Sequence, residues 1–514
     1  MGKGQRARDA RAQDKITNPQ KYTAKKKKKN LSWITPVVLV CIVLVVAAVF
    51  VMNYLNENGI LERRKVVMES EHFQITGTML QYASMTTYQN FEYQYKDYLT
   101  YFGLDTSKKL SSQKYGDGTW YDYFKESAVE MISEALVYAE GAVEAGVELD
   151  EEDLNAIEES IALLSEYASS YGYTEKAYIA TLYGTGVSKD DIREYSKIAS
   201  LATKYENMLR DDEEASLSAD DVEGYYKANL NTYTYADVIY YTDTLILSGE
   251  LTDEEREEQK KNFRESFAGF EAATSADEFN ASVPPESVDD PDTPAGETTE
   301  TSITYSEISM KEAADWVFET ENDEFVRTAG EIKIFEEYNE GSVDEEGNVS
   351  DSNYAVSAYY IVSTPDVDHS MTKNVGHILF KYDSYDSDEA AKAKAEEVYN
   401  EFLAGDMTKE SFEALGKKYT DDSNVFYENV EEGVMVEEFN DWLFDPARTV
   451  GETAVISTAD YGYHIMYFDG DGYEKWYKDC LDAAVAENVA NIYSELTEKH
   501  PVTVHEKVVD SVRE

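Results

Sequence analysis

Cysteine is nearly absent from this chain, which has two such residues, Cys41 and Cys480, among 514. Cys41 lies within a long apolar run and Cys480 far beyond it, so the sequence predicts no intramolecular disulfide and a stability that comes from packing. Histidine is also scarce, with six residues, and none of them has the spacing of metal ligands. The sequence lacks phosphate-binding and dinucleotide-binding loops as well. We therefore expect no metal and no cofactor.

Positive charge is the second deficit. The chain has 46 Lys and Arg against 103 Asp and Glu, a net charge of −57. Eleven of these cations lie within residues 1–30, which form a basic arm, so the rest of the chain carries 35 basic and 101 acidic residues. Nucleic-acid binding needs clustered cations, and the main body has none, so the composition excludes that class of partner. The 41 tyrosines supply ample material for cores, and the length suits about three domains.

Long apolar runs are absent except for one, residues 31–54, which contains no charge. It is long enough to span roughly 30 Å of hydrocarbon, and Lys25–Lys29 lie directly before it. By the positive-inside rule we expect a single-pass protein of the cell membrane, with residues 1–30 cytoplasmic and the remainder extracytoplasmic. A cleaved signal peptide is the alternative. The length of the run and the lack of a small-x-small site after it favour a retained transmembrane helix.

Two stretches with period-two alternation enclose the most informative part of the sequence, residues 375–468. VGHILFKY places His377 on one face of a predicted strand, and YGYHIMYF places His464 on one face of another. Between them the pattern predicts two amphipathic helices, the second beginning behind Thr408, and a short third helix that carries Met435 and Phe439.

This order of elements resembles the parvulin family of peptidyl-prolyl cis/trans isomerases. The resemblance rests on HIL in the first strand, FEALGKKYTDD after the second helix, then GVMVEEF, DWLF, VGE and YGYHI in the family order. It implies an α+β protein with an active parvulin-like domain at residues 370–470.

The resemblance also implies roles for particular residues. His377, Asp422 and His464 correspond to the catalytic positions, and Met435 and Phe439 to the pocket for the proline ring. The glycine-rich GGDLG segment of the family is missing, and the shorter NVFYENVEEG stands in its place. From that segment we predict Phe426 as the third wall of the pocket. Ala459 stands where many members have a threonine hydroxyl that supports the histidine pair, which predicts a weakened hydrogen-bond network.

Residues 236–366 repeat several phrases of the parvulin-like stretch. DWVFE at 315–319 matches DWLFD at 441–445, and RTAGE at 327–331 matches RTVGE at 448–452. Two unrelated small domains that share short phrases are the alternative, but the common order favours a degenerate second copy of the domain. Aligned in this way, Asp237 replaces His377 and Ser357 replaces His464, so we expect this copy to lack isomerase activity.

The flanking regions complete the predicted organisation. Residues 55–235 have a helical pattern that ends in DDVEGYYKANLNTYTY, which resembles the helix before the parvulin domains of PrsA and SurA foldases. Residues 471–514 predict a long helix and a strand that, in such proteins, return to the helical lobe. Two interpretations of the lobe stay open: it holds unfolded chains, or it is a scaffold.

Together the apolar run and the resemblance imply a membrane-anchored peptidyl-prolyl isomerase and foldase. Its partners would be unfolded or partly folded exported polypeptides that contain X-Pro bonds. The alternative is a non-enzymatic holdase or surface scaffold in which the parvulin-like domains only bind chains.

Overall fold

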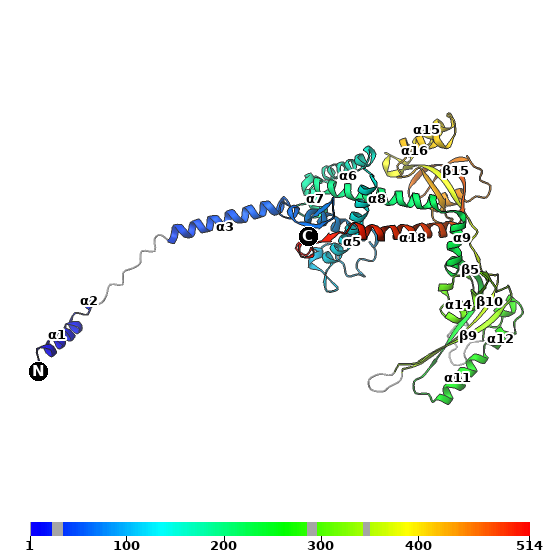
Figure 1. Ribbon diagram of the computed structural model, residues 1–514, viewed down its shortest axis with the longest axis horizontal. Helices are drawn as coiled ribbons and strands as arrows, with labels where there is room; N and C mark the ends of the chain where they lie inside the picture. Colours follow the sequence, from blue (N-terminus) through cyan, green and yellow to red (C-terminus); the bar gives the residue numbers. More distant parts are fainter. Residues whose placement is uncertain (1, 23–33, 285–295, 343–349) are drawn as a thin grey trace. The chain divides into compact units, whose positions relative to one another are not determined.

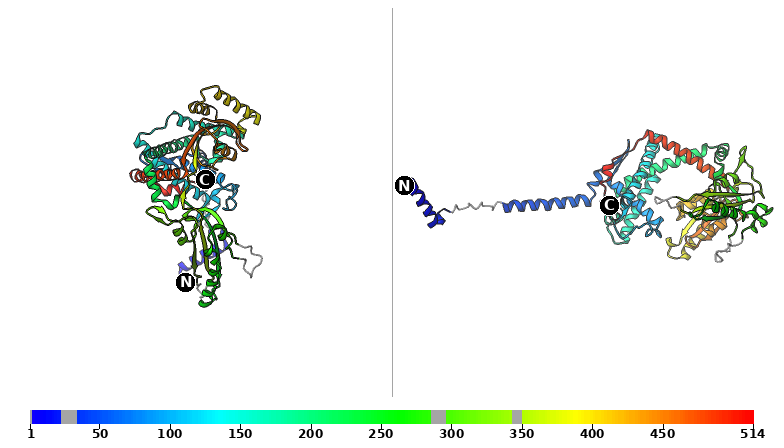
Figure 2. Two further views of the ribbon diagram at one scale, coloured as in Figure 1. Left: turned by 90° about the vertical axis from the view of Figure 1, so that its right-hand side faces the viewer. Right: turned by 90° about the horizontal axis from the view of Figure 1, so that it is seen from below.

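The computed structural model describes residues 2–22, 34–284, 296–342 and 350–514, which divide into two compact units (Figures 1 and 2). The first unit comprises Met1–Met208 and Ile492–Glu514, and the second comprises Leu209–Asn491. Two long helices, α8 (Lys189–Ser216) and α18 (Lys475–Lys499), run from one unit into the other.

The chain begins with three helices: α1 (Lys3–Thr17), α2 (Pro19–Tyr22) and α3 (Ile34–Glu57). The apolar side chains of α3 between Leu44 and Tyr54 are mostly exposed. Within the described ranges, no helix has both the length and the apolar character that a membrane crossing requires. The predicted span of residues 31–54 begins outside the described residues.

The remainder of the first unit combines helices with short strands. Its elements are η1 (Glu62–Arg64), β1 (Val66–Glu69), β2 (Gln74–Thr76), α4 (Gly77–Gln94), η2 (Leu110–Ser112), β3 (Lys114–Tyr115), β4 (Gly118–Thr119), α5 (Trp120–Ala145), α6 (Glu151–Ser170), α7 (Glu175–Tyr183), β16 (Thr503–Val504) and α19 (Glu506–Val509). Side-chain caps begin several helices. The Thr119 hydroxyl accepts a hydrogen bond from the Asp122 amide at the start of α5, and the Asp150 carboxylate accepts from the Glu152 and Asp153 amides at the start of α6.

A three-stranded sheet in the order β16-β1-β2 lies within this unit. The sequence pattern had predicted helices throughout residues 55–235, and this prediction is wrong for β1 and β2 and for the two-residue strands β3 and β4. Strands β1 and β2 have only four and three residues, too few to show a period, and the partner of β1 comes from the far end of the chain. The C-terminal segment therefore shares a core with α4 and α5.

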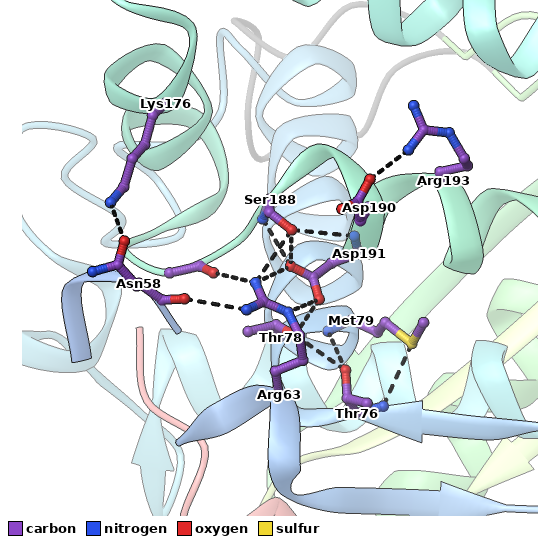
Figure 3. Close-up of polar contacts among 11 residues, drawn as sticks. Asn58, Arg63, Thr76, Thr78, Met79, Lys176, Ser188, Asp190, Asp191 and Arg193 are labelled. Carbon is purple, nitrogen blue, oxygen red and sulfur yellow. Dashed lines mark hydrogen bonds and ion pairs between the residues drawn. The ribbon is translucent and has the colours of Figure 1, made fainter. Parts of the chain in front are cut away.

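One guanidinium joins the end of α3 to the α7–α8 loop (Figure 3). Arg63 donates to both carboxylate oxygens of Asp191, at 2.7 and 2.6 Å, and to the carbonyls of Asn58 and Gly186. Asp191 is 3% exposed and also accepts from the Thr78 hydroxyl at 2.8 Å. This carboxylate is thus buried but fully hydrogen-bonded.

The second unit opens with α9 (Ala219–Ala228) and α10 (Leu230–Tyr233), and α9 packs on α18 around the buried Cys480. Its first module then comprises β5 (Thr234–Leu247), α11 (Asp253–Glu265), α12 (Ala268–Ala272), α13 (Ala276–Asn280), β6 (Thr299–Ile303), η3 (Tyr305–Glu307), α14 (Lys311–Val317), β7 (Thr320–Glu321), β8 (Glu324–Phe325), β9 (Ile332–Asn339), β10 (Ser352–Ile361) and β11 (Asp366–Val367).

The second module comprises β12 (Met371–Lys381), η4 (Tyr382–Ser384), α15 (Asp388–Leu403), α16 (Lys409–Tyr419), β13 (Phe426–Val430), α17 (Glu437–Leu443), β14 (Thr453–Ser457) and β15 (Gly462–Glu474). The predicted cap Thr408 begins α16. Residues 469–474 continue β15, because they pair with Met371–Asn374 of β12.

The two modules share one sheet topology. The order β6-β5-β10-β9 in the first corresponds to β13-β12-β15-β14 in the second. A side-chain clamp also recurs: Arg327 Nε donates to the Trp316 carbonyl at 2.9 Å, and Arg448 Nε donates to the Trp442 carbonyl at 2.7 Å. The repeated RT-x-GE phrase therefore has the same structural role in both modules.

Candidate active site

Two neighbouring strands of the second module bring His377 and His464 together. His464 on β15 lies opposite Leu379 on β12, so His377 is its diagonal neighbour on the same face of the sheet. Both side chains are 4% exposed. Their Nδ1 atoms are 3.1 Å apart, and the rings stack with centroids 5.4 Å apart.

Asp422 extends this pair on the side of His377. Its Oδ2 lies 3.0 Å from His377 Nε2 and accepts a hydrogen bond from the Tyr427 hydroxyl at 3.2 Å, while Oδ1 accepts from the Ser423 amide. The hydrogen bond with His377 is the main cause that lowers the pKa of Asp422 far below its usual value, against the opposing effect of burial. Asp422 is therefore a carboxylate at neutral pH.

The turn after β14 supplies a hydroxyl on the other side of the pair. Thr458 Oγ1 lies 3.1 Å from His464 Nε2, and Thr458 is 2% exposed. The prediction from Ala459 that this hydroxyl is lost is therefore wrong. The threonine is present one residue earlier, and the turn places it under the ring because Thr458 also bonds with Gly462.

These four groups form one hydrogen-bonded chain, and the carboxylate determines its direction. Because Asp422 accepts, His377 Nε2 carries a proton, and in the neutral ring Nδ1 is then an acceptor. With both rings neutral, it receives a hydrogen bond from His464 Nδ1, which leaves His464 Nε2 to accept from the Thr458 hydroxyl. Each ring is thereby held in one tautomer and one orientation.

Burial, followed by the nearby His377, lowers the pKa of His464 to about 4, and Asp422 opposes this shift. We expect the ring carbon signals of His464 to titrate near pH 4 in NMR spectra of the full chain, with the tautomer that bears a proton on Nδ1. A His464→Asn chain identifies the signal by its loss. Because the pKa is lower in the folded than in the unfolded state, this histidine contributes stability above about pH 6.5 that is lost as the pH falls towards 4. A His464 midpoint above 6 would contradict the hydrogen-bonded chain.

Aromatic side chains cover the histidine pair. Phe439 on α17 is 3% exposed and meets both rings edge-on, with centroids 5.4 Å from His377 and 5.8 Å from His464. Tyr427 on β13 lies 5.3 Å from His377, and the half-buried Met435 packs in the same cluster as Phe439. The polar chain thus lies beside an apolar surface.

The structure does not place Phe426 with these residues. Its ring packs on the opposite face of the sheet, against Phe412 of α16 and Tyr467 of β15. Successive residues of a strand point to opposite faces, so the neighbouring Tyr427 occupies the position predicted for Phe426. The sequence between Asp422 and Val430 contains both Phe426 and Tyr427, but nothing in it shows which of the two faces the histidines.

The same register corrects the comparison with the first module. The Gly330 amide donates to the Ile361 carbonyl, and the Gly451 amide donates to the Phe468 carbonyl, each at 2.8 Å, so Ile361 corresponds to Phe468. Four residues earlier in each strand, Ser357 is then the counterpart of His464. Ser357 pairs with Thr242, so the counterpart of His377 lies two residues before it, at Tyr240. The predicted counterpart Asp237 is three residues out of register, because alternating apolar residues match equally well after a shift.

The fold and the histidine pair correspond to one class of domain. Residues 377–470 match the family model described as Rotamase: PPIC-type PPIASE domain. The chain therefore contains a peptidyl-prolyl isomerase domain of the parvulin type, as the sequence had indicated. A search among curated proteins finds no match.

Solved structures of foldases give distant matches to about three quarters of the chain. The crystal structure of PrsA from Bacillus subtilis is 15% identical over 75% of this chain and 91% of that chain, with a TM-score of 0.25. PrsA from Bacillus cereus is 11% identical over 79% of this chain and 98% of that chain, with a TM-score of 0.16. The foldase PrsA from Lactococcus lactis is 9% identical over 70% of this chain and 100% of that chain, with a TM-score of 0.20.

Proposed function

We propose that this chain is an active parvulin-type peptidyl-prolyl cis/trans isomerase that assists the folding of exported polypeptides. The observation that carries the proposal is the row of hydrogen bonds that runs from Thr458 through His464 and His377 to Asp422. The Phe439 ring lies against both histidine rings. The hydroxyl, imidazole and carboxylate groups hold one another in one protonation state and lie beside an apolar surface. Such a site suits a substrate that has both a polar amide and a hydrophobic ring.

The reaction needs no nucleophile. Rotation about an X-Pro bond meets a barrier of about 18–20 kcal/mol, which arises from amide resonance. In our proposal the proline ring lies against Phe439, with Met435 and Tyr427 as the other walls. An amide withdrawn from water loses solvation that favours its planar, resonance-stabilised form, and every 1.4 kcal/mol removed from the barrier speeds the exchange tenfold.

The histidine pair would act through position and polarity. His464 is neutral at physiological pH, since its pKa lies near 4, and His377 is oriented by Asp422. A fixed arrangement of dipoles lowers the energy of the twisted amide without reorganisation during the reaction. Because Asp422 is ionised and already hydrogen-bonded to His377, a covalent step through it has no support.

Exchange spectroscopy by NMR on a short peptide with one X-Pro bond tests the assignment. We expect the full chain, at micromolar concentration, to speed exchange that otherwise takes tens to hundreds of seconds. The non-enzymatic holdase is the competing function, and the absence of histidines in the first module is the observation that favours it. It predicts no enhancement of exchange together with full suppression of client aggregation, and that result would end the enzyme assignment.

We also propose that α3 and the residues before it anchor the protein in the cell membrane, with the body outside the cytoplasm. The support is the uncharged run 31–54, the preceding Lys25–Lys29 and the exposed apolar side chains of α3. Protease added to intact cells should then degrade the chain after Asn56. Protection of the second module in intact cells, with cleavage only after lysis, would exclude this orientation.

A further inference from the structure

The first module contains a cavity of about 530 Å³ between α14 and β9. Its walls include Asp315 and Trp316 from α14, Glu319 just after that helix, and Lys333 and Phe335 from β9. In the order of the sheet β9 is the last strand, and in the described part of the chain it pairs only with β10. The backbone groups along its other edge are therefore open to a further strand.

The aromatic wall of this cavity already accommodates cations. Lys333 Nζ lies 5.0 Å from the centroid of the Phe335 ring and 5.8 Å from that of Trp316, and the Arg327 guanidinium lies 4.9 Å from the Trp316 ring. Ring faces attract cations through their quadrupole. A basic side chain of a bound segment that displaced the Lys333 amino group would contact the same two rings.

The charge of the module has the matching sign. Residues 234–367 contain seven Lys and Arg against 34 Asp and Glu. At the rim of the cavity the exposed Glu312 has no ion-pair partner among the residues that the structure describes. A surface with this imbalance raises the local concentration of cationic segments and speeds their association.

We propose that the open edge of β9 and this cavity form a second polypeptide site, which binds an extended segment rich in lysine or arginine. The segment pairs with β9 as an added strand and places one basic side chain against Trp316 and Phe335. The proposal shares with the proposed function only the idea that the clients are polypeptides. It needs no proline and no residue of the histidine pair.

Fluorescence anisotropy with the full chain in detergent micelles tests this site. The probe is a labelled, proline-free peptide of alternating lysine and threonine, and its counterpart has glutamate in place of lysine. We expect the lysine peptide to bind at least about tenfold more tightly than the glutamate peptide. Glu312→Lys should weaken its binding by about tenfold, whereas Lys333→Glu should strengthen it, because these changes alter the charge at the cavity itself.

Two matched changes on α11 are the controls, since α11 and α14 cover opposite faces of the sheet. Glu258→Lys and Lys261→Glu change the net charge equally and should alter the affinity less than twofold. Equal effects of the control and cavity variants, or no effect of either cavity variant, would overturn the proposal. X-Pro exchange should be unchanged in Glu312→Lys and Lys333→Glu, so failure of this site and failure of the isomerase assignment are distinguishable.

Discussion

Replacement of Phe439 by alanine should reduce X-Pro exchange by roughly a hundredfold or more. The ring is buried against both histidines, and its truncation removes about 3 kcal/mol of apolar burial from the surface that our proposal assigns to the proline ring. Exchange spectroscopy on the wild-type and Phe439→Ala chains, with the folded fraction measured by circular dichroism, gives the ratio directly.

Phe426→Ala is the matched control for this prediction. It removes the same side chain from the same module, but on the other face of the sheet, where Phe426 contacts Phe412 and Tyr467. We expect it to lower stability and to leave the exchange rate per folded molecule within about threefold of wild type. Equal losses of activity in both variants would show that the effect is a general loss of packing.

Removal of Arg63 should destabilise the first unit by roughly 3–5 kcal/mol. Arg63→Met leaves the Asp191 carboxylate buried without its cation, although Thr78 and Ser188 still donate to it. Protection of the α4 and α5 amides against hydrogen exchange reports the change within this unit.

Two comparisons make this prediction specific. Arg193 pairs with Glu158 and Asp190 at the surface, so Arg193→Ala should cost about 1 kcal/mol or less. The double variant Arg63→Met with Asp191→Leu should recover part of the loss, because no charge remains buried. Equal amide protection in wild type and Arg63→Met would show that the Arg63–Asp191 ion pair contributes nothing to stability.

The candidate site was largely predictable from the residues, with errors of a particular kind. The resemblance identified His377, Asp422, His464, Met435 and Phe439, and the structure brings these five together. It missed Thr458 and Tyr427, each adjacent to the residue that the sequence had suggested. Neighbouring residues of a strand or turn face opposite ways, so an error of one position exchanges a core side chain for a site side chain.

By itself the sequence determined the class of the second module, the recurrence of its phrases in the first and the strong charge imbalance, since all three are local or compositional. Only the tertiary structure decided the register that makes Tyr240 the counterpart of His377, the sheet that joins β16 to β1, and the open edge of β9 beside Trp316. These features depend on pairing between segments far apart in the chain. Such pairing is selected by hydrogen bonds and packing across the whole core, which no short stretch of residues encodes.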